Sequence, residues 1–174
     1  MPQTAANSLA DSIIPASRAM LWYAAEATSD IPADRFARRP DGVTCSSPAF
    51  ALGHLAIYPD KLLADFGLPH QDQSRYAAMF EAGNECKDDP DGSIYPSKDE
   101  ILKLFFDRHN ALIEALPSVD EATLAKPNPN ERMRDMFPTL GSMAVFMLTS
   151  HTFMHLGQIS TWRRVMGLGA CMKM

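Results

Sequence analysis

Four segments of this chain carry apolar residues at steps of three and four, and this spacing constrains the fold more than any other feature. The segments cover about residues 4–27, 48–66, 98–116 and 139–166. Such spacing places the apolar side chains along one face of an α-helix. No stretch alternates apolar and polar residues as a half-buried strand does. We therefore predict an all-α fold in which four long helices pack as a four-helix bundle.

Capping signals mark several ends of these segments. Ser47 before a proline is typical of a helix start, and Ser97 with Glu100 three residues later is the pattern of a capping box. Gly67 and Gly167 are placed to close the second and fourth helices in the left-handed conformation.

Two prolines lie inside the predicted helices. Pro15 indicates a kink in the first helix or a start just before it, and Pro59 indicates a bend in the second helix. Both effects follow because proline lacks an amide donor and crowds the preceding turn.

The connections between the predicted helices are long for a bundle. They cover residues 28–46, 67–96 and 118–138, whereas adjacent antiparallel helices are usually joined by about 2–8 residues. At least one connection must therefore cross over the bundle. We expect residues 67–96 to be a long crossover between helices 2 and 3, with a short helix near residues 76–81. Without repeats or low-complexity tracts, the chain is expected to be a single domain over residues 1–174.

Charge and cysteine content exclude several partners and locations. Sixteen Lys and Arg against 21 Asp and Glu give a net charge of −5 without a basic cluster, which disfavours nucleic acid and anionic membrane surfaces. The uncharged stretch 136–162 has no strictly apolar run longer than residues 143–148. It therefore predicts a buried helix and no membrane span. Three cysteines without paired spacing, and no readable signal peptide, favour a cytoplasmic protein.

Three histidines carry most of the chemistry that the sequence offers. His151 and His155 are four residues apart, so on a helix their imidazoles lie one above the other, on the face that must point into the core. His54 lies mid-helix in the second segment, among apolar neighbours. Since buried imidazoles need polar partners or a cation, the three could bind one metal ion and leave open coordination positions. The alternative is that each is a core histidine bonded to a hydroxyl or a carbonyl.

The residues around these histidines limit the reaction. Thr152 follows His151, so the general-base glutamate of the H-E-x-x-H zinc proteases is missing. This favours chemistry that needs only a Lewis acid, such as ionising a bound thiol or polarising a carbonyl. No protein nucleophile is expected beside the metal, because the three cysteines precede the second helix (Cys45), lie in a loop (Cys86) or lie near the C-terminus (Cys171).

The motifs around the histidines resemble a known family. The G-H-L sequence at residues 53–55 after a Ser-Pro helix start, and the H-x-x-x-H pair running into L-G-Q-I at residues 156–159, look like the DinB/YfiT superfamily of metalloenzymes. The resemblance implies a four-helix bundle with a long second crossover, usually a homodimer. It implies that His54, His151 and His155 are the ligands of zinc or nickel. For some members it implies transfer or isomerisation of a small-molecule substrate with a low-molecular-weight thiol.

Two further residues could act beside the metal. Tyr58, one turn after His54, could donate to a bound substrate, and Gln158, one turn after His155, could bond a ligand histidine or line the pocket. Ordinary packing or surface polarity is the alternative for both.

The two remaining histidines are expected outside the site. His109 is expected to be solvated beside Asp107 and Arg108, and His70 is expected to be exposed in a loop.

Two functions remain open. The first is an enzyme whose three-histidine metal activates a thiol or water for transfer or isomerisation of a small molecule. The second is a non-catalytic, metal-binding or stress-related dimer. Open coordination positions facing an accessible cavity would favour the enzyme, and a closed or sealed site would favour the alternative.

Overall fold

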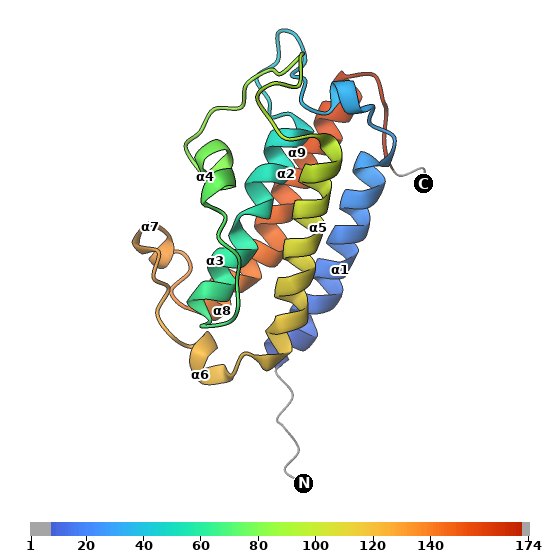
Figure 1. The fold of residues 1–174 in the computed structure, drawn as a ribbon. Coiled ribbons are helices and arrows are strands. Elements are labelled where there is room, and N and C mark those ends of the chain that lie inside the picture. The colour runs from blue at the N-terminus through green and yellow to red at the C-terminus, as the bar shows by residue number, and fades with distance from the viewer. Residues whose placement is uncertain (1–7, 172–174) are drawn as a thin grey trace.

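A computed structural model describes residues 8–171, and four long helical segments lie side by side in it (Figure 1). These are α1 (Ser8–Ser29), α2 with α3 (Pro48–Ala56 and Tyr58–Asp65), α5 (Lys98–Ala115), and α8 with α9 (Leu140–Val145 and Thr152–Val165). Short helices α4 (Ser74–Phe80), α6 (Glu121–Leu124) and α7 (Glu131–Arg134) decorate the connections. Among the described residues, the one β-type pairing is an isolated bridge between Pro127 and Thr139. The predicted all-α four-helix bundle is confirmed.

The segment between α3 and α5 is the long crossover. It leaves the end of α3, carries α4 along the outside of the bundle and enters α5 at the opposite end (Figure 1). As a result, α2 with α3 and α5 run in the same direction, whereas α1 and α9 run the other way. The short helix expected near residues 76–81 is present as α4.

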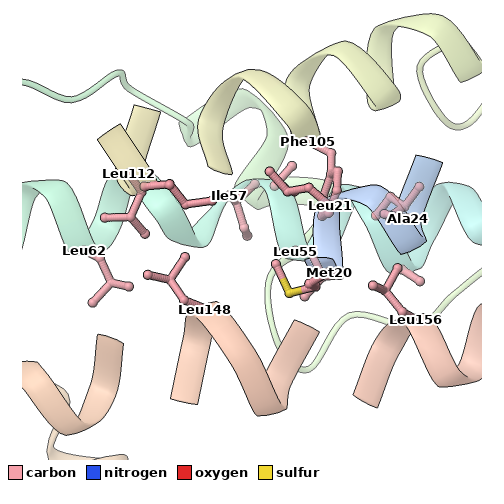
Figure 2. Packing of buried hydrophobic residues seen from close by; sticks show 14 of the residues in the cluster. Met20, Leu21, Ala24, Leu55, Ile57, Leu62, Phe105, Leu112, Leu148 and Leu156 are labelled. Carbon is pink, nitrogen blue, oxygen red and sulfur yellow. The ribbon is translucent and has the colours of Figure 1, made fainter. Parts of the chain in front are cut away.

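All four long segments contribute to one apolar core (Figure 2). The labelled residues are Met20, Leu21 and Ala24 from α1, Leu55, Ile57 and Leu62 from the second segment, Phe105 and Leu112 from α5, and Leu148 and Leu156 from the fourth. Burying each large apolar side chain stabilises the fold by about 1.5–3 kcal/mol, so the amphipathic spacing drives the assembly.

The uncharged stretch 136–162 supplies much of this core, as predicted. Its fully or nearly fully buried side chains include Leu140, Leu148, Leu156, Ile159 and Trp162. Within the part of the chain that the structure describes, no helix has the length and apolarity that a membrane crossing requires.

The helix ends follow the predicted signals with one exception. Ser47 Oγ accepts the N–H of Phe50 at the start of α2, and the left-handed Gly67 and Gly167 close α3 and α9. Ser97 Oγ accepts the N–H of Glu100 as expected.

The predicted capping box at Ser97 is only half formed. The Glu100 carboxylate accepts the hydroxyl of Tyr76 in α4 at 2.8 Å, so it is bonded to the crossover. The reciprocal capping box occurs instead at α8, between Thr139 and Ser142. The contact between α4 and α5 therefore uses the Glu100 side chain, which the local sequence predicted in the capping box.

The two prolines have different effects. Pro59 lies just after the break between α2 and α3 at Ile57, which confirms the bend predicted for the second segment. Pro15 lies inside α1, and the helix is already formed at Ser8. The proline therefore does not mark the start of this helix. The expected start of this helix near residue 4 lies outside the described residues.

Arg163 fastens the end of α9 to the end of α1. Its side chain is buried, and its guanidinium donates to the carbonyl of Ala27 at 3.0 Å and to both oxygens of the Asp30 carboxylate. The neighbouring Trp162 donates its indole N–H to the carbonyl of Arg38 at 2.8 Å. These contacts hold the helix that carries His155.

The ion pair predicts a pH-dependent effect of Asp30→Asn. Arg163 lowers the pKa of Asp30 from its usual 3.8, so the pair contributes stability above that unfolded-state value and loses it as the pH falls through the lower, folded-state value. The free energy of unfolding at pH 7 should fall by about 1–2 kcal/mol, because the variant leaves a buried guanidinium without its counter-charge.

Urea unfolding at pH 7 and pH 3 measures this effect. The difference between parent and variant should shrink at pH 3, and Asp34→Asn, a control at a nearby exposed carboxylate, should change stability by less than about 0.5 kcal/mol. A difference that stays constant with pH would contradict the role given to this pair.

Candidate metal centre

The three predicted histidines converge inside the bundle. One ring nitrogen from each of His54, His151 and His155 can be chosen so that all three atoms lie within 4.8 Å of one another. The Nε2 atoms of His54 and His151 are 3.3 Å apart. This matches the roughly 3.3 Å that separates two nitrogens bound tetrahedrally to one zinc ion with bonds of about 2.0–2.1 Å.

His54 is oriented by the crossover. Its Nδ1 lies 2.7 Å from the carbonyl oxygen of Phe80, the last residue of α4. Because a carbonyl only accepts hydrogen bonds, Nδ1 carries the proton and Nε2 presents its lone pair to the other two histidines. The His54 ring also stacks at 6.5 Å on Phe50, one turn earlier in α2.

Gly53 allows this arrangement. A Cβ atom at this position would lie 2.5 Å from the ring of Phe80, well inside van der Waals contact. Only a residue without a side chain therefore lets Phe80 pack close enough for its carbonyl to meet His54. The glycine of the G-H-L motif thus acts through packing, since its backbone φ is not positive.

His151 and His155 come from a helix that is not continuous. Residues Phe146–His151 form a π-helical turn between α8 and α9, and Thr152 Oγ1 donates to the carbonyl of Met147, five residues earlier. The helix predicted over 139–166 is present over 140–165, and the spacing of apolar residues did not predict the π-helical hydrogen bonding within it. A π turn adds one residue, which rotates the preceding chain by about 100° relative to the following chain. The turn ends at His151, so it sets the direction from which this side chain approaches the other two histidines.

Gln158 orients the third histidine. Its Oε1 lies 2.9 Å from His155 Nδ1. An amide oxygen accepts, so His155 holds its proton on Nδ1 and leaves Nε2 free. Gln158 is exposed and lines a cavity, and it also contacts His155, so it has surface polarity as well as the contact with a histidine.

Burial keeps all three imidazoles in the form that binds metal. It lowers the pKa of His54 and of His155 below the usual 6.5. It lowers the pKa of His151 to about 3, with further lowering by the neighbouring His155 and His54. Neutral imidazoles with free lone pairs are the metal-ligating form, so the donor set fits a divalent ion.

Tyr58 lies against the centre and borders a cavity. Its ring centroid is 4.9 Å from that of His54 and 5.5 Å from that of His151. Burial raises the pKa of Tyr58, so the phenol is protonated at neutral pH and can donate. The cavity measures about 720 Å³, and its lining includes Tyr58, Met143 and Met147 together with the Lys61–Glu81 ion pair.

The other two histidines differ from each other. His70 is exposed, as predicted. The prediction that His109 is solvated is wrong, because this side chain is 2% exposed and its ring packs at 4.3 Å on Phe105. Burial lowers the pKa of His109 to about 4. The adjacent charged residues do not draw His109 into solvent: Asp107 pairs with Lys103 outside the core, and Arg108 reaches towards Asp60.

The fold and the site together define a helical-bundle protein with a candidate three-histidine metal centre. A family model described as the DinB superfamily matches residues 15–159, a span that contains His54, His151 and His155. The chain therefore belongs to the DinB superfamily. No curated protein and no solved structure matches it.

The close packing at Gly53 predicts a loss of stability in Gly53→Ala. The added methyl group would displace the Phe80 ring from the core, at a cost of about 1–3 kcal/mol in the free energy of unfolding. The matched control is Gly157→Ala in α9, where a Cβ would meet no atom within 4 Å. Replacing glycine with alanine in an open helix position should stabilise by about 0.5–1 kcal/mol. Chemical denaturation compares the two, and an unchanged Gly53→Ala protein would refute the packing argument.

Proposed function

We propose that this protein is a metal-dependent enzyme in which His54, His151 and His155 hold a divalent ion, with zinc or nickel as the best candidates. The observation that carries the proposal is the shared orientation of the imidazoles. His54 and His155 each use Nδ1 as a hydrogen-bond donor, so their free Nε2 atoms and the nearby Nε2 of His151 are available to one ion.

Three nitrogen ligands leave coordination positions for a substrate atom, which is the arrangement of catalytic zinc sites. When bound, the ion would supply Lewis acidity, ionising a small thiol or a water molecule without a nearby general base. The chain's own part is to hold the imidazoles neutral and oriented, and to place the Tyr58 hydroxyl beside them as a donor to the substrate.

The cavity beside Tyr58 supports the catalytic reading over a purely structural site. Its volume of about 720 Å³ falls within the roughly 300–1,000 Å³ typical of small-molecule sites. Met143 and Met147 give it an apolar wall, and Lys61, Asp65, Glu81 and Arg132 supply charges of both signs. We propose that this cavity binds the small-molecule substrate, which would carry both apolar and charged groups. The reaction would be transfer or isomerisation with a low-molecular-weight thiol.

The protein thiols are poorly suited to serve as the nucleophile. Cys45 and Cys86 line a separate cavity of about 450 Å³ that also touches Gln158, so they come closer to the centre than their positions in the sequence indicated. Burial raises the pKa of Cys45, which disfavours its thiolate. An external thiol or water remains the better nucleophile.

We also propose that the protein acts in the cytoplasm as a homodimer. The three cysteines are free thiols in the structure, in keeping with a reducing compartment. Large exposed apolar side chains on the neighbouring helices α1 and α9, Trp22, Phe153 and Met154, are in keeping with a second copy packing there. A monomer mass in solution at micromolar concentration would remove the dimer from the proposal.

Metal binding is tested on purified protein by elemental analysis and by zinc titration. We expect one ion per chain, and loss of binding in His54→Ala, His151→Ala and His155→Ala while circular dichroism stays helical, because the apolar core carries the fold. His70→Ala, at an exposed histidine, is the control and should bind like the parent. A parent protein that binds no divalent ion would end the proposal.

The chemistry is tested with Cys45→Ser, Cys86→Ser and Cys171→Ser variants, assayed with low-molecular-weight thiols and electrophilic small molecules. All three variants should keep activity, and a chelator should abolish it in each. Activity that survives the chelator but disappears with one cysteine would overturn the mechanism. Metal binding without activity on any thiol or electrophile would favour the non-catalytic alternative.

A further inference from the structure

His109 is a fourth histidine in the bundle core, on α5, and one of its nitrogens is uncommitted. Its Nδ1 lies 2.9 Å from the carbonyl oxygen of Phe105. A carbonyl only accepts, so Nδ1 carries the proton and Nε2 is left as an acceptor. No described residue donates a hydrogen bond to this Nε2. An acceptor in the bundle core is best satisfied by a donor, which can come from the protein or from water.

Within the described part of the chain, His151 lacks an acceptor for its Nδ1–H, whereas His109 lacks a donor to its Nε2. His54 and His155 each donate an Nδ1–H, to Phe80 and to Gln158 respectively. The Nε2 of His151 faces the other two histidines, and no described residue accepts from its Nδ1. Since an imidazole that binds metal through Nε2 almost always donates its other N–H, His151 is the one member of the trio without an orienting partner.

A small enclosed cavity lies between these two histidines. His109 and His151 both line it, at the junction of α3, α5 and the π-helical turn. Its volume is about 10 Å³, which is close to the space that one water molecule needs. Most of the remaining wall is apolar, from Leu55, Pro59, Leu62 and Leu112.

Two other polar side chains, Tyr58 and Thr152, line this cavity. Thr152 donates its hydroxyl hydrogen to the Met147 carbonyl within the π turn, and its oxygen keeps a lone pair that can accept from a water molecule. Of the polar side chains at this cavity, His109 is the one that comes from α5, so a bond to its Nε2 connects His151 to a different long helix.

We infer that His109 is a positioning residue of the metal centre: one water molecule held in this cavity accepts a hydrogen bond from His151 Nδ1–H and donates one to His109 Nε2. This inference rests on the proposed function, because it gives His151 the role of a metal ligand. It gives each of the three ligands a separate anchor: α4 for His54, α9 itself for His155, and α5 for His151. The anchor from α5 fixes the ring of the histidine that follows the irregular π turn.

The test compares His109→Gln with His109→Asn. Glutamine can place an acceptor near the position of Nε2, whereas asparagine reproduces only the donor to Phe105. Zinc dissociation constants are measured by competition with a chromogenic chelator, and urea unfolding of the metal-free proteins reports stability. We expect His109→Asn to bind zinc about 10–100-fold more weakly and His109→Gln to stay within about threefold of the parent. His70→Asn is the control and should bind like the parent.

Several results would overturn the inference. Equal zinc affinity of both variants and the parent would show that His109 only packs, and so would an equal loss in both variants. The two proposals fail separately, since a parent protein without zinc binding removes the proposed function and the inference together, whereas an unaffected His109→Asn removes the inference alone.

A second measurement needs no variant. Long-range ¹H–¹⁵N correlation spectra of the zinc-loaded parent report which nitrogen of each imidazole carries a proton. We expect the Nδ1–H tautomer at both His109 and His151, the latter with its Nε2 bound to zinc. A proton on His109 Nε2 would overturn the inference even if the variants do not fold.

Discussion

The hydrogen bond from His54 Nδ1 to the carbonyl of Phe80 is the interaction on which the rest of the centre depends. It selects the tautomer that turns Nε2 towards the other histidines, and it requires α4 to lie close against α2. That approach is possible only because Gly53 leaves room for the Phe80 ring. The long crossover therefore contributes more than a connection between helices, since it supplies the acceptor that orients a buried imidazole.

The fourth helical segment, α8 with α9, has two structural roles. It must bring two imidazoles to the same point and also fill the core with apolar side chains. The π turn Phe146–His151 rotates the residues before it by about 100° relative to those after it, and buried side chains from both parts belong to one core. The bonds of Arg163 to Ala27 and Asp30 then hold the far end of α9 on α1. An irregular backbone next to a site is tolerated where such contacts fix the helix on both sides.

The choice between an enzyme and a non-catalytic protein turns on what lies beside the histidines. A structural zinc site is closed by four protein ligands, whereas the described residues bring only three metal-binding side chains together. Tyr58 contacts His54 and His151 and also lines a cavity large enough for a small molecule. These two features are the basis of the proposed activity.

The helical class, the bundle and the identity of the three converging histidines follow from the spacing of residues along the chain. Spacing of three and four residues specifies the buried face of each helix, and i, i+4 spacing places His151 near His155 whatever surrounds them. The bend at Pro59 was also readable, since the missing amide acts locally. The remaining features depend on tertiary contacts. The burial of His109, the loss of Glu100 from its capping box and the acceptor for His54 all depend on which distant backbone or side chain arrives there. The π turn has the same origin, because its cost within one helix is offset by contacts with others that spacing along the chain does not encode.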